Sequence, residues 1–149
     1  MLRFISRIGF FVISISVQSQ NLTVYMSEMD VETTLDQIVS VIKQNENLVF
    51  FETVAHDVLA KERGLDLAPT RSVLFEEPVL TTALIKCQAT AALDLPLEIL
   101  VWEEHEEVYV GFIDPKYMIR RFMISDCDET IRALSSVLTR VCVKGLKPN

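Results

Sequence analysis

The stretch LEILVWEEHEEVYVGFI, residues 97–113, determines the fold class. The runs 97–103 and 108–113 are apolar and rich in β-branched and aromatic side chains, which is typical of strands. The polar segment Glu104-His105-Glu106 lies between them. We therefore predict two strands joined as an antiparallel hairpin.

Outward from this hairpin, the chain alternates between further strand and helix patterns. We predict three more strands, at residues 22–26, 48–54 and 71–75. Asp30 is a good N-cap for a helix whose apolar residues recur at helical spacing up to Ile42. Further helices are expected from Pro78 to about Lys86, as short turns near 58–60 and after Pro115, and from a capping box at 125–128 to Gly145.

Strands grouped as hairpins, with helices between them and at the end, predict an α+β fold. We expect an antiparallel sheet of about five strands with helices mainly on one face, which makes a two-layer sandwich. The sequence shows no internal repeat or linker, so we expect a single domain over residues 22–143 and a short tail over 144–149.

Composition narrows the class of protein. The chain has 149 residues, 50% of them hydrophobic, and a formal net charge of −7. This much apolar material argues against a disordered chain, and the acidic balance argues against non-specific nucleic-acid binding. We therefore expect no nucleic acid as a partner. No apolar run reaches the length of a membrane span, so we also expect no transmembrane helix in the processed chain.

The first residues differ from the rest. Arg3 and Arg7 precede an apolar run over residues 8–17, and a polar segment follows. This is the pattern of a secretory signal peptide over residues 1–19, with cleavage before Gln20. It predicts an exported protein, periplasmic or secreted. Two other interpretations stay open, in which the protein is cytoplasmic: an extra N-terminal strand, or a true start at a downstream methionine.

Three cysteines are present and none forms a Cys-x-x-Cys motif. Cys127 and Cys142 fall on one predicted helix, about 22 Å apart at the helical rise, so they do not bridge each other. Buried free thiols are the expectation. Pairing of Cys87 depends on tertiary structure, and a nucleophilic role for Cys87 is a further alternative.

The two histidines have different settings. His105 lies in a run of acids at the hairpin tip, where a solvated turn is the simple interpretation and a surface metal ion the alternative. His56 follows an apolar strand beside Asp57, at the start of a short helix. It is either a structural histidine or a ligand or acid–base group facing a cleft.

Nucleotide, serine-hydrolase and zinc-protease motifs are absent from the sequence. We therefore expect no cofactor, no metal and no catalytic residue, and we lean away from an enzyme.

Two segments resemble a known family. Residues 70–78, TRSVLFEEP, and 90–101, TAALDLPLEILV, are similar to the bacterial and archaeal family called domain of unknown function 302. His56 with the Ala and Gly that follow it fits as well, and so do Asp114-Pro115 and Tyr117; the resemblance covers about residues 22–143. It implies a small α+β fold and a homodimer, and it supplies no established reaction. The chain departs from the family at Glu76-Glu77, where Gly-Asn is usual.

The resemblance also suggests a ligand-binding site built from His56, Arg71 and Asp94. Pro96 favours an extended residue 95, which leaves Asp94 well placed to accept hydrogen bonds. We expect a bidentate Arg71–Asp94 pair that fixes the loop, or a small-molecule or anion pocket, or metal pocket, shared with His56.

Together these features favour a non-enzymatic binding or interaction domain of the bacterial envelope that acts as a homodimer. The alternative is a small enzyme or metal-dependent sensor that uses His56, with Asp94 or Cys87. A purely structural subunit would show a large exposed apolar patch and no pocket.

Overall fold

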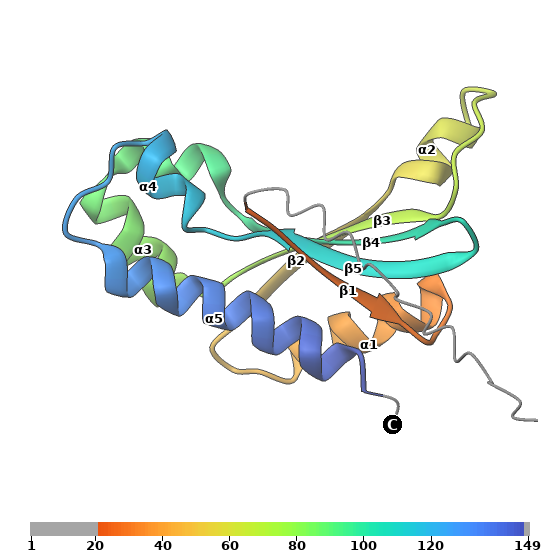
Figure 1. Ribbon diagram of the computed structural model, residues 1–149, viewed down its shortest axis with the longest axis horizontal. Coiled ribbons are helices and arrows are strands. Elements are labelled where there is room, and N and C mark those ends of the chain that lie inside the picture. The colour runs from red at the N-terminus through yellow and green to blue at the C-terminus, as the bar shows by residue number, and fades with distance from the viewer. Residues whose placement is uncertain (1–20, 148–149) are drawn as a thin grey trace, which may run out of the picture.

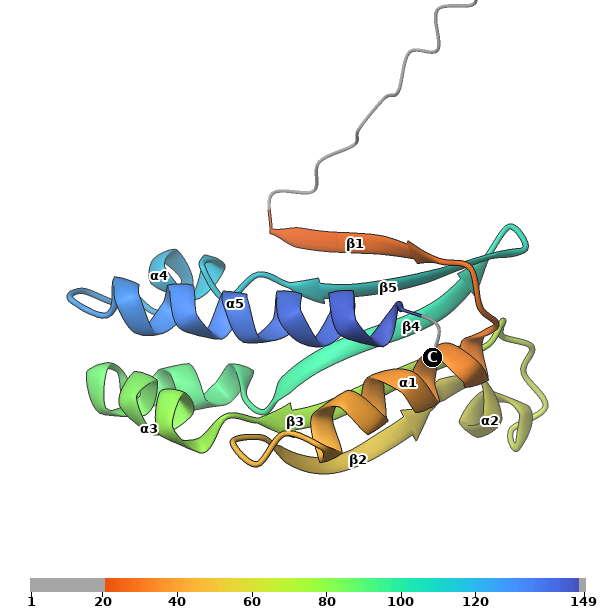
Figure 2. The same cartoon turned by 90° about the horizontal axis from the view of Figure 1, so that it is seen from below.

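The computed structural model describes residues 21–147. The segment 1–19, where we predict a signal peptide, lies outside the described residues. One layer is a sheet, and α1 and α5 lie together along one of its faces (Figures 1 and 2). The predicted α+β architecture is confirmed.

The sheet has five strands in the order β1-β5-β4-β3-β2, and every neighbouring pair is antiparallel. The strands are β1 (Leu22–Ser27), β2 (Val49–Ala55), β3 (Thr70–Glu76), β4 (Leu97–Glu104) and β5 (Glu107–Ile113). The predicted hairpin joins β4 to β5. Its two turn residues, His105 and Glu106, both have positive φ, 53° and 66°, as a two-residue turn that matches strand twist requires.

Alternation along the middle strand creates two unlike faces. Leu97, Ile99 and Val101 of β4 are buried beneath the helices. Successive side chains on a strand point to opposite sides, so the next residues along β4 point away from the helices. The register carries this alternation across the sheet. We call the uncovered side the open face; its central residues are Ser72, Leu74, Glu98, Leu100, Trp102, Tyr109, Gly111, Ile113, Leu22, Val24 and Met26.

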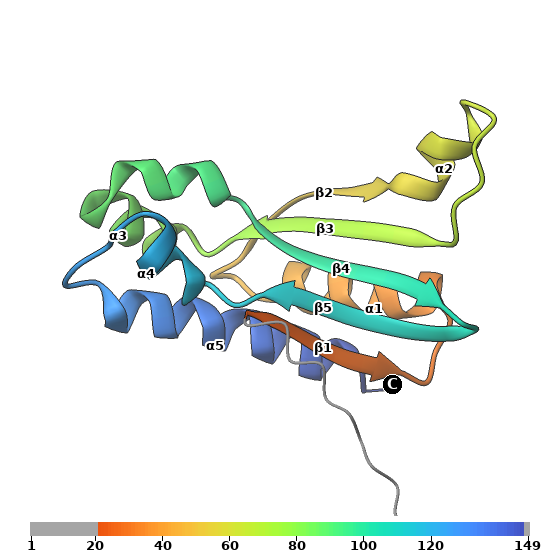
Figure 3. The same cartoon turned by 45° about the horizontal axis from the view of Figure 1, so that its top comes forward.

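The helices are α1 (Val31–Lys43), α2 (His56–Lys61), α3 (Pro78–Cys87), α4 (Tyr117–Arg121) and α5 (Asp128–Gly145), with a 3₁₀ helix η1 (Ala89–Asp94). Asp30 caps α1 as predicted, because its carboxylate accepts the Thr33 amide hydrogen at 2.8 Å. α2 projects beyond one end of the sheet, whereas α3, η1 and α4 gather at the other end (Figures 1 and 3).

Close contact between α1 and α5 closes the covered side. A Cβ at Gly145 would lie 2.6 Å from Cγ1 of Ile38, so only glycine allows this approach. Gly145 is the last residue of α5, where the sequence predicts the end of this helix. Within residues 21–147, none of the helices combines the length and apolar composition that a membrane crossing needs.

Two local predictions were wrong, and one element was missed. The N-cap of α5 is Cys127, which makes no side-chain cap bond, so the capping box expected at 125–128 does not form. The helix η1 was not predicted. Cys87 and Cys127 form a disulfide with their Cα atoms 6.4 Å apart, instead of standing as free thiols, and Cys142 alone is buried and free. The paired Cys87 is not available as a nucleophile.

Candidate functional site

The three residues proposed from the sequence, His56, Arg71 and Asp94, make their contacts in three separate groups. The His56 and Arg71 groups share α2 and β3 but lie on opposite sides of β3, whereas the Asp94 group lies at the other end of the sheet.

His56 lies at the first residue of α2 and reaches the open face of β3. Its Nε2 lies 3.0 Å from Oγ of Ser72, and that hydroxyl donates to Oε1 of Glu98 at 2.5 Å. A serine hydroxyl carries one hydrogen, and here Ser72 donates that hydrogen in its bond to Glu98. The bond between His56 and Ser72 must therefore be donated by Nε2 of His56. Ser72 is only 2% exposed, whereas His56 and Glu98 are exposed. This chain of hydrogen bonds, from His56 to Ser72 to Glu98, holds the Glu98 carboxylate in place and does not activate Ser72 as a nucleophile.

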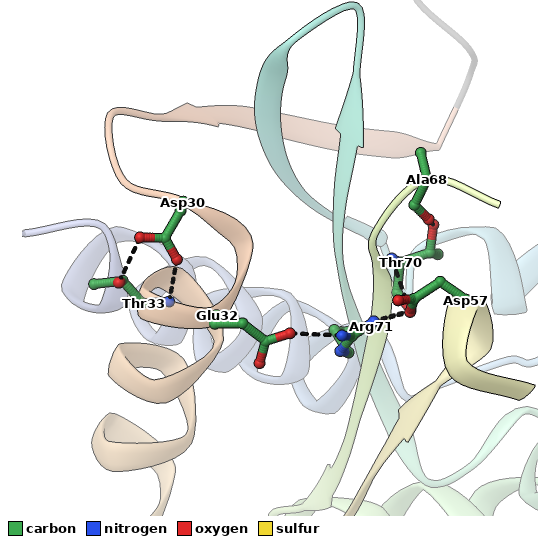
Figure 4. Close-up of polar contacts among 7 residues, drawn as sticks. All are labelled: Asp30, Glu32, Thr33, Asp57, Ala68, Thr70 and Arg71. Carbon is green, nitrogen blue, oxygen red and sulfur yellow. Dashed lines mark hydrogen bonds and ion pairs between the residues drawn. The ribbon is translucent and has the colours of Figure 1, made fainter. Parts of the chain in front are cut away.

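Arg71 points to the opposite side of β3 from Ser72, toward α1. It forms ion pairs with Asp57 of α2 and, at 2.6 Å, with Glu32 in the first turn of α1 (Figure 4). Asp57 also accepts the Thr70 amide hydrogen at 3.4 Å. The Arg71 side chain is 12% exposed and meets two carboxylates, so this group is an internal clamp between α1, α2 and β3 and not an open anion site.

Asp94 ends η1 at the far end of the sheet. It accepts a hydrogen bond from the Tyr117 hydroxyl and pairs with Nε of Arg121 at 3.0 Å. The expected Arg71–Asp94 pair is therefore wrong. The cause is the antiparallel register, in which Arg71 lies beside Val101 whereas the start of β4 lies beside Phe75. Leu95 is extended, as the following proline predicts, with φ −116° and ψ 154°.

Burial and the neighbouring Asp94 carboxylate raise the pKa of Tyr117 well above its ordinary value. Both causes act in the same direction, because each disfavours the phenolate. Tyr117 therefore stays a neutral hydrogen-bond donor to Asp94, and this bond lies at one end of a cavity beside η1.

A cavity of about 600 Å³ opens at the η1 end of the open face, between β4, β5, η1 and α4, and reaches inward to the buried Leu97 and Leu138. Its outer walls are mostly apolar: Leu22, Leu74, Leu93, Leu95, Pro96, Leu100, Trp102 and Ile113. Asp94, Glu98 and Tyr117 are its polar groups. The cavity thus brings together residues from two of the three groups, and neither His56 nor Arg71 lines it.

Gly111 shapes the floor of this cavity. A Cβ there would lie 3.2 Å from the Trp102 ring and 3.0 Å from the backbone oxygen of Thr23. Trp102 also stacks on Tyr109, with ring centroids 5.4 Å apart. A glycine in the interior of a predicted strand often marks such a close approach, and apolar residues on both sides of a strand are a second signal. Sequence reasoning used neither and missed the cavity.

The two acids that depart from the family pattern serve α3. The Glu77 carboxylate accepts the Leu80 amide hydrogen at 2.5 Å, and the Thr81 hydroxyl donates to Glu76 at 3.3 Å. Glu77 is the N-cap of α3, and both acids lie at the N-terminus of this helix, where negative charge is favourable. His105 occupies the hairpin turn, and the described residues contain no cluster of three or more His, Cys, Asp or Glu side chains able to hold a metal ion.

Comparisons with known proteins agree with this architecture. The profile of the family Domain of unknown function DUF302 matches residues 22–141. The crystal structure of an uncharacterized conserved DUF302 protein from Bacillus stearothermophilus superposes with a TM-score of 0.77 at 15% identity, over 87% of this chain and 100% of that chain. That likeness concerns the fold alone.

The chain also matches part of two longer curated proteins. The chain is 30% identical over 121 residues to Fluoride-specific ion channel FluC 1 of Brucella suis biovar 1 (strain 1330) and to its namesake in Brucella abortus biovar 1 (strain 9-941). The match covers 80% of this chain but only 47% and 44% of those proteins. The chain thus spans less than half the length of these relatives.

The raised pKa of Tyr117 predicts how the protein responds to alkali. A folded-state pKa above the unfolded value stabilises the fold fully below the ordinary tyrosine value of 10.0, and this contribution is lost as pH rises above it. We expect ultraviolet phenolate titrations of the folded wild type and of Tyr117→Phe to coincide near pH 10. They should separate only once alkali unfolds the wild type.

The matched control is Tyr109→Phe, which removes a tyrosine from the open face without touching Asp94. A smaller phenolate signal near pH 10 in folded Tyr117→Phe than in the wild type would contradict the assignment.

Proposed function

The chain belongs to the family Domain of unknown function DUF302, and from that premise we propose that it is a non-enzymatic binding domain whose binding site is the cavity on the open face. Ligand pockets are typically concave and mostly apolar, with about 300–1,000 Å³ of volume and a few placed polar groups. The single observation that carries the proposal is this cavity of about 600 Å³, with apolar walls and polar groups at Asp94, Glu98 and Tyr117.

The alternative functions have less support. An enzyme or metal-dependent sensor based on His56 needs that ring to face a site, but His56 does not line the cavity and its Nε2 is bonded to Ser72. Cys87 is held in a disulfide. A purely structural subunit needs an apolar patch without a pocket, and the open face has both.

Trp102 is a built-in probe for this proposal, because it lines the cavity and is the chain's one tryptophan. We expect phenethyl alcohol, a neutral aromatic probe, to change Trp102 fluorescence in a saturable way. Leu74→Phe, which places a bulkier ring at the cavity wall, should weaken that binding at least severalfold. Leu67→Phe makes the same substitution at an exposed position outside the cavity and is the control. A non-saturable signal, or equal binding by the two variants, would refute the cavity as the site.

We also propose that the domain works in the bacterial envelope as a homodimer. Export is supported by the character of residues 1–19 and by the Cys87–Cys127 disulfide, since structural disulfides persist mainly in oxidising compartments. Dimerisation is supported by β1, an edge strand whose Leu22, Val24 and Met26 are 42%, 41% and 61% exposed. An edge strand with exposed apolar side chains is suited to pairing with another chain.

Native mass spectrometry of the protein purified from its own host tests these points together. We expect a mature chain that begins at Gln20, a complex of two copies, and a mass lowered by the hydrogens lost when Cys87 and Cys127 pair. A cytosolic protein that keeps Met1 would refute export. A monomer at micromolar concentration would refute dimerisation, whatever the fate of the N-terminus.

A second candidate function is suggested by the curated relatives. Because proteins named as fluoride-specific ion channels share 30% identity with this chain over 121 residues, we propose that the domain has an accessory role beside such a channel. Deleting the gene should then lower the fluoride concentration that stops growth of the host, and a plasmid copy should restore it. Chloride at the same concentration is the control. Unchanged fluoride tolerance would refute this role.

A further inference from the structure

We propose that the ligand of the open-face cavity is an organic cation: a small molecule with an aromatic or alkyl body and a protonated amine. This inference rests on the proposed binding function and adds the chemical class of the ligand. It is argued from the charges, the aromatic ring and the apolar walls that the cavity presents.

The charge of the cavity has one sign. Among the described residues that line it, Asp94 and Glu98 are the charged ones, and both are acids. Asp94 is already paired with Arg121 at 3.0 Å. Within residues 21–147 Glu98 forms no ion pair, so it is the carboxylate whose charge a ligand can neutralise.

Glu98 is held ready for a donor. Its Oε1 accepts the Ser72 hydroxyl at 2.5 Å, and Ser72 is fixed in turn by His56 at 3.0 Å. A carboxylate offers about four lone-pair positions on its two oxygens, so one serine hydroxyl leaves acceptor capacity for an ammonium group. A hydrogen bond between two charged groups is among the stronger ones in proteins.

Trp102 adds a second attraction for a cation. Its ring lines the cavity, is stacked on Tyr109 and lies close over Gly111. The face of an indole ring attracts ammonium groups electrostatically, and tryptophan is the most effective aromatic residue for this contact. Because Leu100 pairs with Gly111 and Trp102 pairs with Tyr109, this ring and the apolar wall lie side by side on the open face.

The apolar walls of the cavity determine the chemistry of the part of the ligand beyond its amine. Leu74, Leu95 and Leu100 surround the volume, so the body of the ligand is apolar. An anion with the same body would meet two carboxylates and no cationic lining group, which makes the anion ligand considered from the sequence the less favourable chemistry.

Three probes that share a phenyl body separate these contributions: phenethylamine, phenethyl alcohol and hydrocinnamate. Titrated into the full chain near neutral pH and followed by Trp102 fluorescence and calorimetry, the amine should bind about tenfold more tightly than the alcohol, with the acid weakest. Glu98→Gln keeps the shape of the side chain and removes its charge. It should lower amine affinity about tenfold and leave alcohol affinity unchanged.

The control variant is Glu104→Gln, which removes a charge from the same side of the same strand outside the cavity and should change neither affinity. Equal binding of amine and alcohol would overturn the cation proposal while leaving the cavity as a binding site. Unaltered amine binding by Glu98→Gln would also overturn it. If none of the three probes binds saturably, the proposed function fails and the cation proposal fails with it.

Discussion

The hydrogen-bonded register of β4 between β3 and β5 determines which side chains meet the helices and which meet solvent. A shift of one residue would exchange the two sets, because side chains alternate along a strand. Ile99 would then face solvent and Glu98 would enter the core against α1 and α5. The cost of burying an unpaired carboxylate makes that arrangement unfavourable. The register that buries one set of side chains thus also places the Trp102–Gly111 contact and the cavity walls on the open face.

Local patterns predicted most of this architecture because their causes are local. The Asp30 cap, the helical stripe that follows it and the polar turn at His105 each depend on residues only a few positions apart. The features that were missed depend on distant partners. Cys87 and Cys127 are 40 residues apart, and their pairing brings the end of α3 to the start of α5. The same junction uses Cys127 as the N-cap, which no local rule for polar caps would select.

The candidate site was harder to predict than the fold, for a geometric reason. Arg71 and Ser72 are neighbours in sequence but face opposite sides of β3. Arg71 therefore pairs with Asp57 on one side, whereas Ser72 bonds Glu98 on the other. Asp94, in the second segment that resembles the family, lies at the opposite end of the sheet because β3 and β4 run antiparallel. The cavity itself draws on β1, β3, β4 and β5, and no spacing within one segment of the sequence indicates such an assembly.

The contacts of His56, Arg71 and Asp94 nevertheless all help to position the two acids of the cavity. The Arg71–Asp57 ion pair holds the first turn of α2, and the residue beside Asp57 in that turn is His56. His56 bonds Ser72, and Ser72 bonds Glu98, so the clamp on the helix side of β3 supports a carboxylate on the open side. At the other end of the cavity, Asp94 is fixed by Tyr117 and Arg121. Both acids of the cavity are therefore already held by hydrogen bonds or ion pairs within the fold, which keeps their carboxylates in place before any ligand arrives and lowers the ordering cost of binding.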